Sequence, residues 1–223
     1  MKLEKLLEKL DYTLDAGSVD VDIVSLEYDS RKVGKGSLFV CLTGFRADGH
    51  EYIPAAVAAG AVALVVEREV STPEGVTVIR VKDSRYALAL LSAAWLGHPA
   101  EKMTVIGLTG TKGKTTTAHM VKSILEAAGH KVGMIGTVGA VIGKELLPTK
   151  NTTPESYELH SLFARMVEEG CSHVVMEASS QGFKLHRTAG IEFELGIFTN
   201  LSVDHLDYHG TMEQYAQEKH KLF

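Results

Sequence analysis

The amino-acid sequence predicts an α/β protein made of two consecutive domains, and three observations lead to this prediction. Short apolar runs alternate with helix-like segments, which is typical of a parallel sheet covered by helices. A glycine-rich turn with a lysine joins a strand to a helix at residues 110–115. His98-Pro99 interrupts the alternation, which places the domain boundary between residues 1–99 and 100–223.

The first domain is predicted to alternate strands and helices around its own core. Leucines recur at helical spacing in the first ten residues, and Pro54 suits the first turn of a later helix. Ser84 is expected to cap the last helix, and Gly97 is expected to end it. The expected elements are a helix within 1–11, two strands within 24–44 joined by a turn at 34–36, a helix at 53–60, strands at 61–67 and 77–83, and a helix at 84–97.

The second domain alternates strand and helix more regularly. Its expected strands are 103–110, 130–137, 172–179 and 193–200, its helices are 115–128, 154–169 and 212–223, and a hairpin is expected at 138–148. The last helix reaches residue 223 without a stop signal, and a parallel sheet is expected to continue beyond its last strand. The sequence therefore predicts a truncated domain.

Composition limits the classes of protein that fit. The chain has 223 residues, of which 45% are hydrophobic and 23% charged, and its formal charge is −5, which argues against nucleic-acid binding. No apolar run approaches the roughly 20 residues needed to span a bilayer. Cys41 and Cys171 lie in apolar runs without metal or disulfide spacing, so two buried thiols in the cytoplasm are expected.

The most specific local motif is the sequence GLTGTKGKTTT, which follows an apolar strand. Gly110 and Gly113 let backbone amides approach an anion, and the helix N-terminus adds partial positive charge. Lys114 is expected to reach the β- and γ-phosphates, and the Thr115 hydroxyl to bind Mg²⁺. The predicted nucleotide-binding residues are Gly110, Thr111, Lys112, Gly113, Lys114, Thr115 and Thr116.

The loop departs from the general phosphate-binding pattern, which requires glycine where this chain has Leu108. A glycine turn that merely caps an ordinary helix, with Lys114 in solvent, is the alternative interpretation.

Downstream residues extend the prediction toward a metal and a substrate. Glu177 ends a buried strand at the sheet edge that carries the loop, so it is a candidate Mg²⁺ ligand or else a surface carboxylate. The segment 204–209 contains Asp204, His205, Asp207 and His209, which either bind metal or serve as turn and cap residues. Residues 151–153 precede Pro154; a hydroxyl there is expected to cap the helix, and the same helix end can also face an anionic substrate. Arg187 either pairs with an anion or is solvated.

Together these residues resemble the Mur ligase family, and within it the tripeptide-synthetase branch. The resemblance rests on the segments DSRKVGKGSLFVCLTGFRADGHEYI, GLTGTKGKTTT, NTTP, MEASS with a later HR, and TNLSVDHLDYHGTMEQYAQEK, which occur in family order across nearly the whole chain. It implies a UDP-binding N-terminal domain, a P-loop-type ATPase domain that is truncated here, and an absent Rossmann-like third domain.

The resemblance also implies a reaction. ATP would phosphorylate the D-glutamyl carboxylate of UDP-N-acetylmuramoyl-L-alanyl-D-glutamate, and the amine of diaminopimelate or lysine would attack the acyl phosphate. The enzyme would serve peptidoglycan synthesis in the cytoplasm as a monomer, and the 223-residue chain alone would be inactive. A generic P-loop ATPase and a non-catalytic UDP-muramoyl-binding module are the alternatives.

Site roles follow from the same resemblance. Lys114 and Thr115 would hold the phosphates and one Mg²⁺, and Glu177 and His205 a second. Lys219 would be carbamylated by CO₂, although fraying near the chain end is expected to oppose this. The remaining positions are assigned to UDP (Ser30, Phe45, Arg46 and Ala47) and to the muramoyl peptide (Asn151, Thr152, Thr153, Ser179 and Arg187).

Three positions depart from the family pattern. Lys112 replaces a usual asparagine and adds a charge beside the nucleotide. Gln181 stands where histidine is frequent, and Leu185 stands where a polar glutamine often accompanies the arginine.

Overall fold

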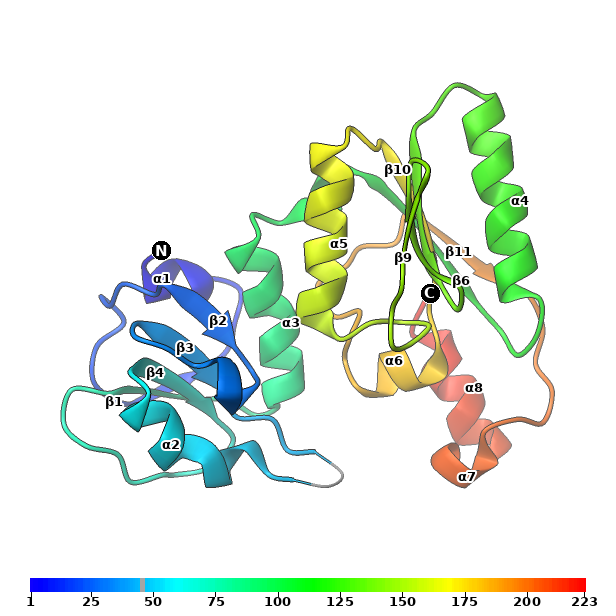
Figure 1. The fold of residues 1–223 in the computed structure, drawn as a ribbon. Helices are drawn as coiled ribbons and strands as arrows, with labels where there is room; N and C mark the ends of the chain where they lie inside the picture. Colours follow the sequence, from blue (N-terminus) through cyan, green and yellow to red (C-terminus); the bar gives the residue numbers. More distant parts are fainter. Residues whose placement is uncertain (45–46) are drawn as a thin grey trace. The chain divides into compact units, whose positions relative to one another are not determined.

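The computed structural model describes residues 1–44 and 47–223, which form two compact units, Met1–Trp95 and Leu96–Phe223. Each unit contains its own sheet (Figure 1). The division falls a few residues before the predicted boundary. Between the two, Gly97 and His98 both adopt left-handed backbone conformations, with φ of 72° and 52°. The predicted mixed α/β class is confirmed.

The first unit is built on a five-stranded sheet in the order β1-β5-β4-β3-β2. Strands β2 to β5 are parallel, and β1 joins β5 antiparallel at the edge. The apolar runs predicted as strands form the buried centre, whereas all four residues of β1 are exposed, which is why their apolar pattern was too weak to predict a strand. The bounds are β1 (Thr13–Ala16), β2 (Ser25–Glu27), β3 (Ser37–Val40), β4 (Ala61–Val66) and β5 (Thr77–Arg80).

Helices cover both faces of this sheet. One face packs on helix α2 through Ile53 and Ala56, and alternate strand residues face helix α3 on the other side. The helical bounds are α1 (Leu3–Leu6), α2 (Ile53–Ala58) and α3 (Ser84–Trp95), with 3₁₀ turns η1 (Ser30–Lys32) and η2 (Gly49–Tyr52).

Two sequence-based details of the first unit need correction. Ser84 is the first helical residue rather than the cap, because the Asp83 carboxylate accepts the Tyr86 N–H at 2.8 Å. The Ser84 hydroxyl donates instead to Glu67 Oε1 at 2.7 Å. Strands β2 and β3 are parallel and linked through η1, so the turn at residues 34–36 forms only part of their connection.

The second unit is built on a six-stranded sheet in the order β11-β6-β10-β7-β8-β9. The first four strands are parallel, and β8 and β9 extend the sheet as the predicted antiparallel hairpin. The bounds are β6 (Thr104–Thr109), β7 (Val132–Gly136), β8 (Gly139–Ile142), β9 (Glu145–Leu147), β10 (His173–Glu177) and β11 (Leu195–Phe198).

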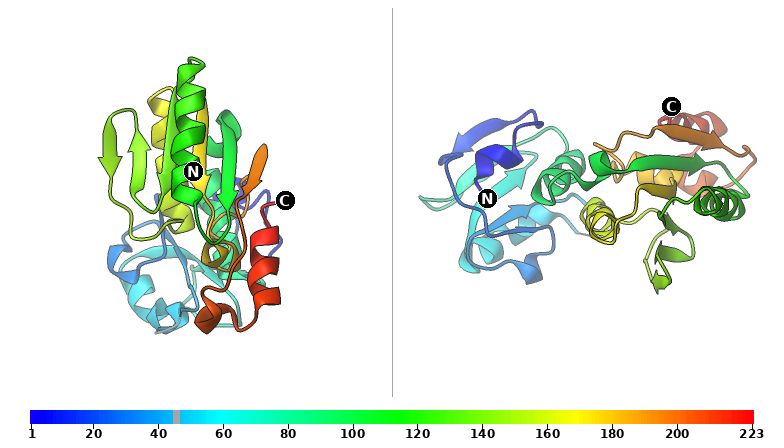
Figure 2. Two further views of the ribbon diagram at one scale, coloured as in Figure 1. Left: turned by 90° about the vertical axis from the view of Figure 1, so that its right-hand side faces the viewer. Right: turned by 90° about the horizontal axis from the view of Figure 1, so that it is seen from above.

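Helices α4 and α5 lie on opposite faces of this sheet (Figures 1 and 2). Ala118 of α4 packs with Val175 of β10, whereas Phe163 of α5 packs with Val174 and Met176 of the same strand. The remaining helices lie near the carboxyl ends of the strands. The bounds are α4 (Lys114–Ala127), α5 (Ser156–Glu168), α6 (Ser180–Lys184), α7 (Leu206–His209) and α8 (Met212–His220), with the 3₁₀ turn η3 (Pro99–Lys102).

The start of α5 differs from the prediction. Glu155 is the N-cap, and its carboxylate accepts the Ser156 N–H at 3.2 Å, so residues 151–153 do not cap this helix. The hydroxyls of Thr152 and Thr153 are therefore free to contact Thr137 and Glu177 instead. Within the described residues, 1–44 and 47–223, no helix has the length and apolar character needed to cross a bilayer.

Candidate nucleotide and substrate site

The turn between β6 and α4 has a backbone that requires glycine. Gly110 and Gly113 have φ of 141° and 82°. A Cβ atom on Gly110 would lie 2.0 Å from Thr199 Oγ1, so both conformation and space exclude a side chain there. Gly113 is the N-cap of α4, which directs the first free amides of the helix toward the turn.

The end of β11 anchors this turn from the neighbouring strand. The Thr111 N–H donates to Asn200 O at 2.9 Å, and the Lys112 N–H donates to Asn200 Oδ1 at 3.0 Å. Thr199 Oγ1 donates to Lys112 O at 2.8 Å. The buried Thr111 hydroxyl lies 3.2 Å from the hydroxyl of Tyr215. Thr199 and Asn200, which follow β11, therefore fix the conformation of the turn.

Lys114 folds back over the turn rather than extending into solvent. Its Nζ donates to Gly110 O at 2.9 Å and to Thr111 O at 3.2 Å. Burial lowers the pKa of the Lys114 ammonium, and the Lys112 charge acts in the same direction, whereas Glu177 opposes the shift. Phosphate oxygens of a nucleotide bound at the turn would replace these two carbonyl groups as acceptors from the ammonium.

Glu177 is a buried carboxylate at the end of β10, with 2% of its surface exposed. Its Oε1 accepts from Thr115 Oγ1 at 2.9 Å and from the Thr137 N–H at 3.0 Å, and its Oε2 accepts from Thr137 Oγ1 at 3.1 Å. A Cβ atom on Gly136 would lie 2.2 Å from Glu177 Oε1. The alternative of a surface carboxylate is wrong, because the carboxylate is enclosed beside the first turn of α4.

The two histidines of residues 204–209 pair with residues other than Glu177. His205 has φ of 52° and a half-exposed side chain, and the ionic contact it makes is with Asp204 at 3.9 Å. His209 is instead buried, with Nε2 2.9 Å from Ser180 Oγ. Across residues 1–44 and 47–223, no group of three or more histidine, cysteine or acidic side chains is arranged to hold a metal ion. A metal at Glu177 would therefore need ligands from the bound substrates.

Lys112 also contacts Asp204. Its Nζ lies 3.9 Å from Asp204 Oδ2, and 77% of its side chain is exposed. Since its backbone carbonyl and amide are already used by Asn200, the side chain can turn without disturbing the loop.

Four of the five residues assigned to the muramoyl peptide gather beside Glu177. Thr153 Oγ1 donates to Glu177 O at 2.9 Å and accepts the Ser179 N–H at 2.9 Å. Arg187 Nη1 donates to Thr153 O at 3.0 Å, and its side chain is 13% exposed, so the solvated interpretation is wrong. Thr152 Oγ1 lies 3.1 Å from Thr137 Oγ1.

The fifth of these residues, Asn151, is exposed, and its backbone carbonyl accepts from Thr149 at 3.1 Å. Arg187 has further polar capacity, because its buried Nε lies 3.5 Å from Glu155 Oε2 without forming a hydrogen bond. A carboxylate or phosphate in reach of this guanidinium would find a donor already oriented by Thr153.

A separate pocket of about 510 Å³ lies in the first unit around Ser30 and Ala47. Asp29 caps η1 and holds the Arg31 guanidinium through bonds of 2.8 and 2.6 Å, which lowers the pKa of Asp29 to about 2. Phe45 and Arg46, which were assigned to UDP, lie outside the described residues. The lining residues are Tyr28, Asp29, Ser30, Arg31, Phe39, Leu42, Ala47, Gly49 and Tyr52.

The aromatic residues of this pocket and the Asp29–Arg31 pair were not predicted as site residues. Their positions follow from the parallel pairing of β2 with β3, which brings residues 28–31 and Phe39 together.

Lys219 is buried, in contrast to the expected fraying. Its Nζ donates to Gly110 O at 2.7 Å and lies 4.4 Å from the centroid of the Tyr215 ring. Burial lowers the pKa of Lys219 to about 8, and the nearby Lys114 charge adds to the shift. The end of α8 is held because Leu222 packs into an apolar cluster with Ala178.

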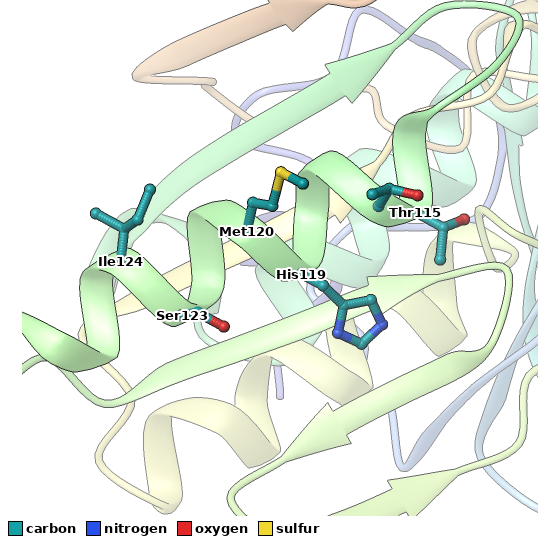
Figure 3. A pocket seen from close by; sticks show the side chains of 6 residues that line it. Thr115, His119, Met120, Ser123 and Ile124 are labelled. Carbon is teal, nitrogen blue, oxygen red and sulfur yellow. The ribbon is translucent and has the colours of Figure 1, made fainter.

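An open pocket of about 690 Å³ runs along α4 from the turn that follows β6 (Figure 3). It is lined by Thr115 and Thr116 and, farther along the helix, by His119 and Met120. Thr116, which was predicted to contact the nucleotide, therefore lies beside Thr115 on a surface continuous with the loop.

Two family models match the chain. The model described as "Mur ligase middle domain" matches residues 108–223, and the model described as "Mur ligase family, catalytic domain" matches residues 22–96. Together they cover most of both structural units.

Two similar curated proteins carry the name UDP-N-acetylmuramoyl-L-alanyl-D-glutamate–2,6-diaminopimelate ligase. The protein of Clostridium perfringens is 48% identical over all of this chain and 46% of its own length. That of Geobacillus thermodenitrificans is 48% identical over all of this chain and 45% of its own length. The chain thus spans about half the length of the curated relatives it matches.

Solved structures agree in fold. A structure of a ligase with the same name matches with a TM-score of 0.84 and 28% identity, over 100% of this chain and 44% of that one. The MurF ligase of Thermotoga maritima in complex with ADP matches with a TM-score of 0.59 and 26% identity, over 89% and 42% of the two chains. The matched models, the shared fold and the loop beside a buried glutamate lead to one conclusion: the chain belongs to the Mur ligase family.

Proposed function

We propose that the protein containing this chain is an ATP-dependent ligase of peptidoglycan synthesis. It adds a third amino acid to UDP-N-acetylmuramoyl-L-alanyl-D-glutamate through an acyl phosphate, in the cytoplasm. The names of the two curated relatives favour diaminopimelate as that amino acid. The observation that carries the proposal is the meeting of Lys114, Thr115 and Glu177 with Thr153 and Arg187 at one sheet edge.

The roles of the residues follow from their chemistry. Lys114 and the amides of residues 113–115 bind and orient the terminal phosphates of ATP. Thr153, Ser179 and Arg187 orient the acceptor so that its carboxylate faces the γ-phosphate, and positioning supplies much of the rate enhancement in such a transfer. The pocket around Ser30 holds the uridine diphosphate.

The residues beside the turn fit a magnesium ion. The Thr115 hydroxyl and the Glu177 carboxylate are hard oxygen ligands, and Mg²⁺ commonly uses one or two carboxylates together with substrate phosphates. Bound there, Mg²⁺ would neutralise charge on the transferred phosphoryl group. His205 is proposed as a further ligand that turns toward the site when substrates bind.

Separate calorimetric titrations with UDP-N-acetylmuramoyl dipeptide and with Mg²⁺-ATP test the proposal. Binding of both ligands is expected. A generic ATPase would turn over nucleotide without regard to the sugar nucleotide, and a non-catalytic module would bind the sugar nucleotide without any Mg²⁺-ATP response. Because the chain spans about half the length of its relatives, tripeptide product is expected from the whole protein and not from these 223 residues alone.

Lys219 is proposed to react with CO₂, because the neutral amine is the reactive form. A pKa of about 8 leaves roughly a tenth of these side chains neutral at pH 7, against roughly one in 3,000 for an ordinary lysine. The amine nitrogen bonds to carbon, one proton leaves, and the product is an anionic carbamate. At fixed dissolved CO₂, we therefore expect carbamate occupancy to rise between about pH 6.5 and 8.5.

Carbon-13 NMR of the protein in labelled bicarbonate measures that occupancy. The carbamate resonance is expected in the chain without substitutions and in Lys221→Arg, since Lys221 is half-exposed and paired with Glu218. It is expected to vanish in Lys219→Arg. A resonance that survives in Lys219→Arg would assign the modification to another amine.

A further inference from the structure

Thr137, at the end of β7, lies between the candidate metal carboxylate and the candidate substrate segment. It contacts both oxygens of Glu177, at 3.0 Å through its backbone N–H and at 3.1 Å through its hydroxyl. The same hydroxyl lies 3.1 Å from the hydroxyl of Thr152. Neither the family resemblance nor the sequence pattern had assigned a role to this residue.

The donors and acceptors available to these three side chains determine the direction of the hydrogen bonds between them. The ionised Glu177 carboxylate only accepts, so the single hydroxyl proton of Thr137 is donated to Oε2. At Thr152 the Thr137 oxygen must then accept, and Thr152 is the donor. The order is therefore Thr152 to Thr137 to Glu177, with every proton used once.

The geometry also fixes how Glu177 is held. Thr115 and the Thr137 N–H both donate to Oε1, and the Thr137 hydroxyl is the side-chain donor to Oε2. The lack of a side chain on Gly136, where a Cβ atom would lie 2.2 Å from Oε1, allows the end of β7 to approach the carboxylate. Loss of the Thr137 hydroxyl would leave Oε2 without this donor, while Oε1 keeps the two donors of its own.

We propose that Thr137 is a positioning residue that orients Glu177 for Mg²⁺ and couples metal binding to the substrate segment through Thr152. This inference rests on the proposed function, because it assumes that Glu177 receives a metal. A metal bound to Glu177 draws electron density from the carboxylate and weakens the hydrogen bond that Glu177 accepts from Thr137. Because Thr137 in turn accepts from Thr152, the position of Thr152 then depends on the metal. Removal of partners that orient metal ligands commonly lowers metal affinity by about 10- to 100-fold.

The test compares Thr137→Val with Thr137→Ser. Valine has the shape of threonine without its hydroxyl, and serine keeps the hydroxyl; Thr137 is exposed, so neither change disturbs a core. ADP is titrated calorimetrically at stepwise Mg²⁺ concentrations and again in EDTA. Thr137→Val is expected to raise the Mg²⁺ concentration for half-maximal ADP affinity by about tenfold, whereas Thr137→Ser stays within about twofold of the unmodified chain.

Thr152→Val tests the hydrogen bond from Thr152 to Thr137, the first step of the series Thr152–Thr137–Glu177, here called the relay. Alone it is expected to raise the Mg²⁺ requirement by about twofold to threefold, and in combination with Thr137→Val it is expected to add nothing. Additive effects of the two substitutions would contradict a relay. Metal-free ADP binding is expected to be the same in all variants, which a merely structural role for Thr137 would not produce.

The outcomes separate this inference from the proposed function. If Mg²⁺ does not strengthen ADP binding even in the unmodified chain, the proposed function fails. If Mg²⁺ strengthens binding equally in the unmodified chain and in Thr137→Val, the positioning role alone is overturned. A loss of metal-free ADP binding in Thr137→Val also overturns it, because Thr137 would then act on the phosphate loop.

Discussion

Replacement of Lys114 by alanine is expected to weaken ATP binding by about 100- to 1,000-fold, equivalent to about 3–4 kcal/mol. The ammonium is half-buried on the carbonyl groups of Gly110 and Thr111, which already hold it over the turn. Phosphate oxygens would therefore meet a charged donor that loses little conformational freedom on binding. Alanine removes that charge and leaves the anion with amides alone.

Calorimetry of Mg²⁺-ATP and of UDP-N-acetylmuramoyl dipeptide measures this effect, and the sugar nucleotide is expected to bind Lys114→Ala normally. Lys112→Ala is the matched control within the same loop. Its side chain is 77% exposed and 3.9 Å from Asp204, so a change of no more than about tenfold is expected. Unaltered ATP binding by Lys114→Ala would contradict the assignment of the loop.

Substitution of Glu177 by glutamine is expected to remove most of the benefit of Mg²⁺, about 100-fold in nucleotide affinity at saturating metal. Glutamine keeps the size of the side chain but carries no charge, and its amide nitrogen cannot ligate a cation. Thr115 and Thr137 both donate toward this carboxylate, so the amide would also leave one hydroxyl donor without an acceptor.

The measurement is ADP affinity with Mg²⁺ and with EDTA. In Glu177→Gln the two values are expected to converge, whereas in Glu192→Gln, an exposed position, they are expected to differ as in the unmodified chain. A Glu177→Gln protein that retains the full Mg²⁺ response would place the metal elsewhere.

Much of the fold was predictable because buried strands leave a strong apolar pattern. Strands β4, β6 and β10 are almost entirely buried; β4 is a continuous apolar run, and β6 and β10 have apolar residues between polar ends. Strand β1 is fully exposed, and α6 and α7 have five and four residues, too short for a helical period to emerge. The strands that are most buried were thus the ones that the sequence predicted most clearly.

Helix starts were less predictable because several residues compete for each cap. Ser84 suits an N-cap by type, but Asp83 takes that position and frees the Ser84 hydroxyl for Glu67. Thr153 likewise suits a cap, yet its hydroxyl contacts Glu177 and Ser179. In both cases a nearby acidic residue is the N-cap, and the hydroxyl that suited the cap by type has a tertiary partner instead.

The candidate site was predictable in its residues and less so in its contacts. Strand ends at one edge of a parallel sheet meet, so Glu177 could be expected near Lys114. The bond from Lys219 to Gly110 spans more than a hundred residues, and no local pattern encodes it. Thr137 could not be predicted as a site residue because a threonine after a strand is common. Its contact is with Glu177, which lies on the adjacent strand.

The most direct test of the account is a crystal structure with Mg²⁺ and a non-hydrolysable ATP analogue. The predicted result is that the β- and γ-phosphates contact Lys114 and the amides of residues 113–115. The metal is predicted about 2.1 Å from Thr115 Oγ1, on the side that faces Glu177. Phosphates bound away from this turn, or a metal that contacts neither Thr115 nor Glu177, would contradict the account.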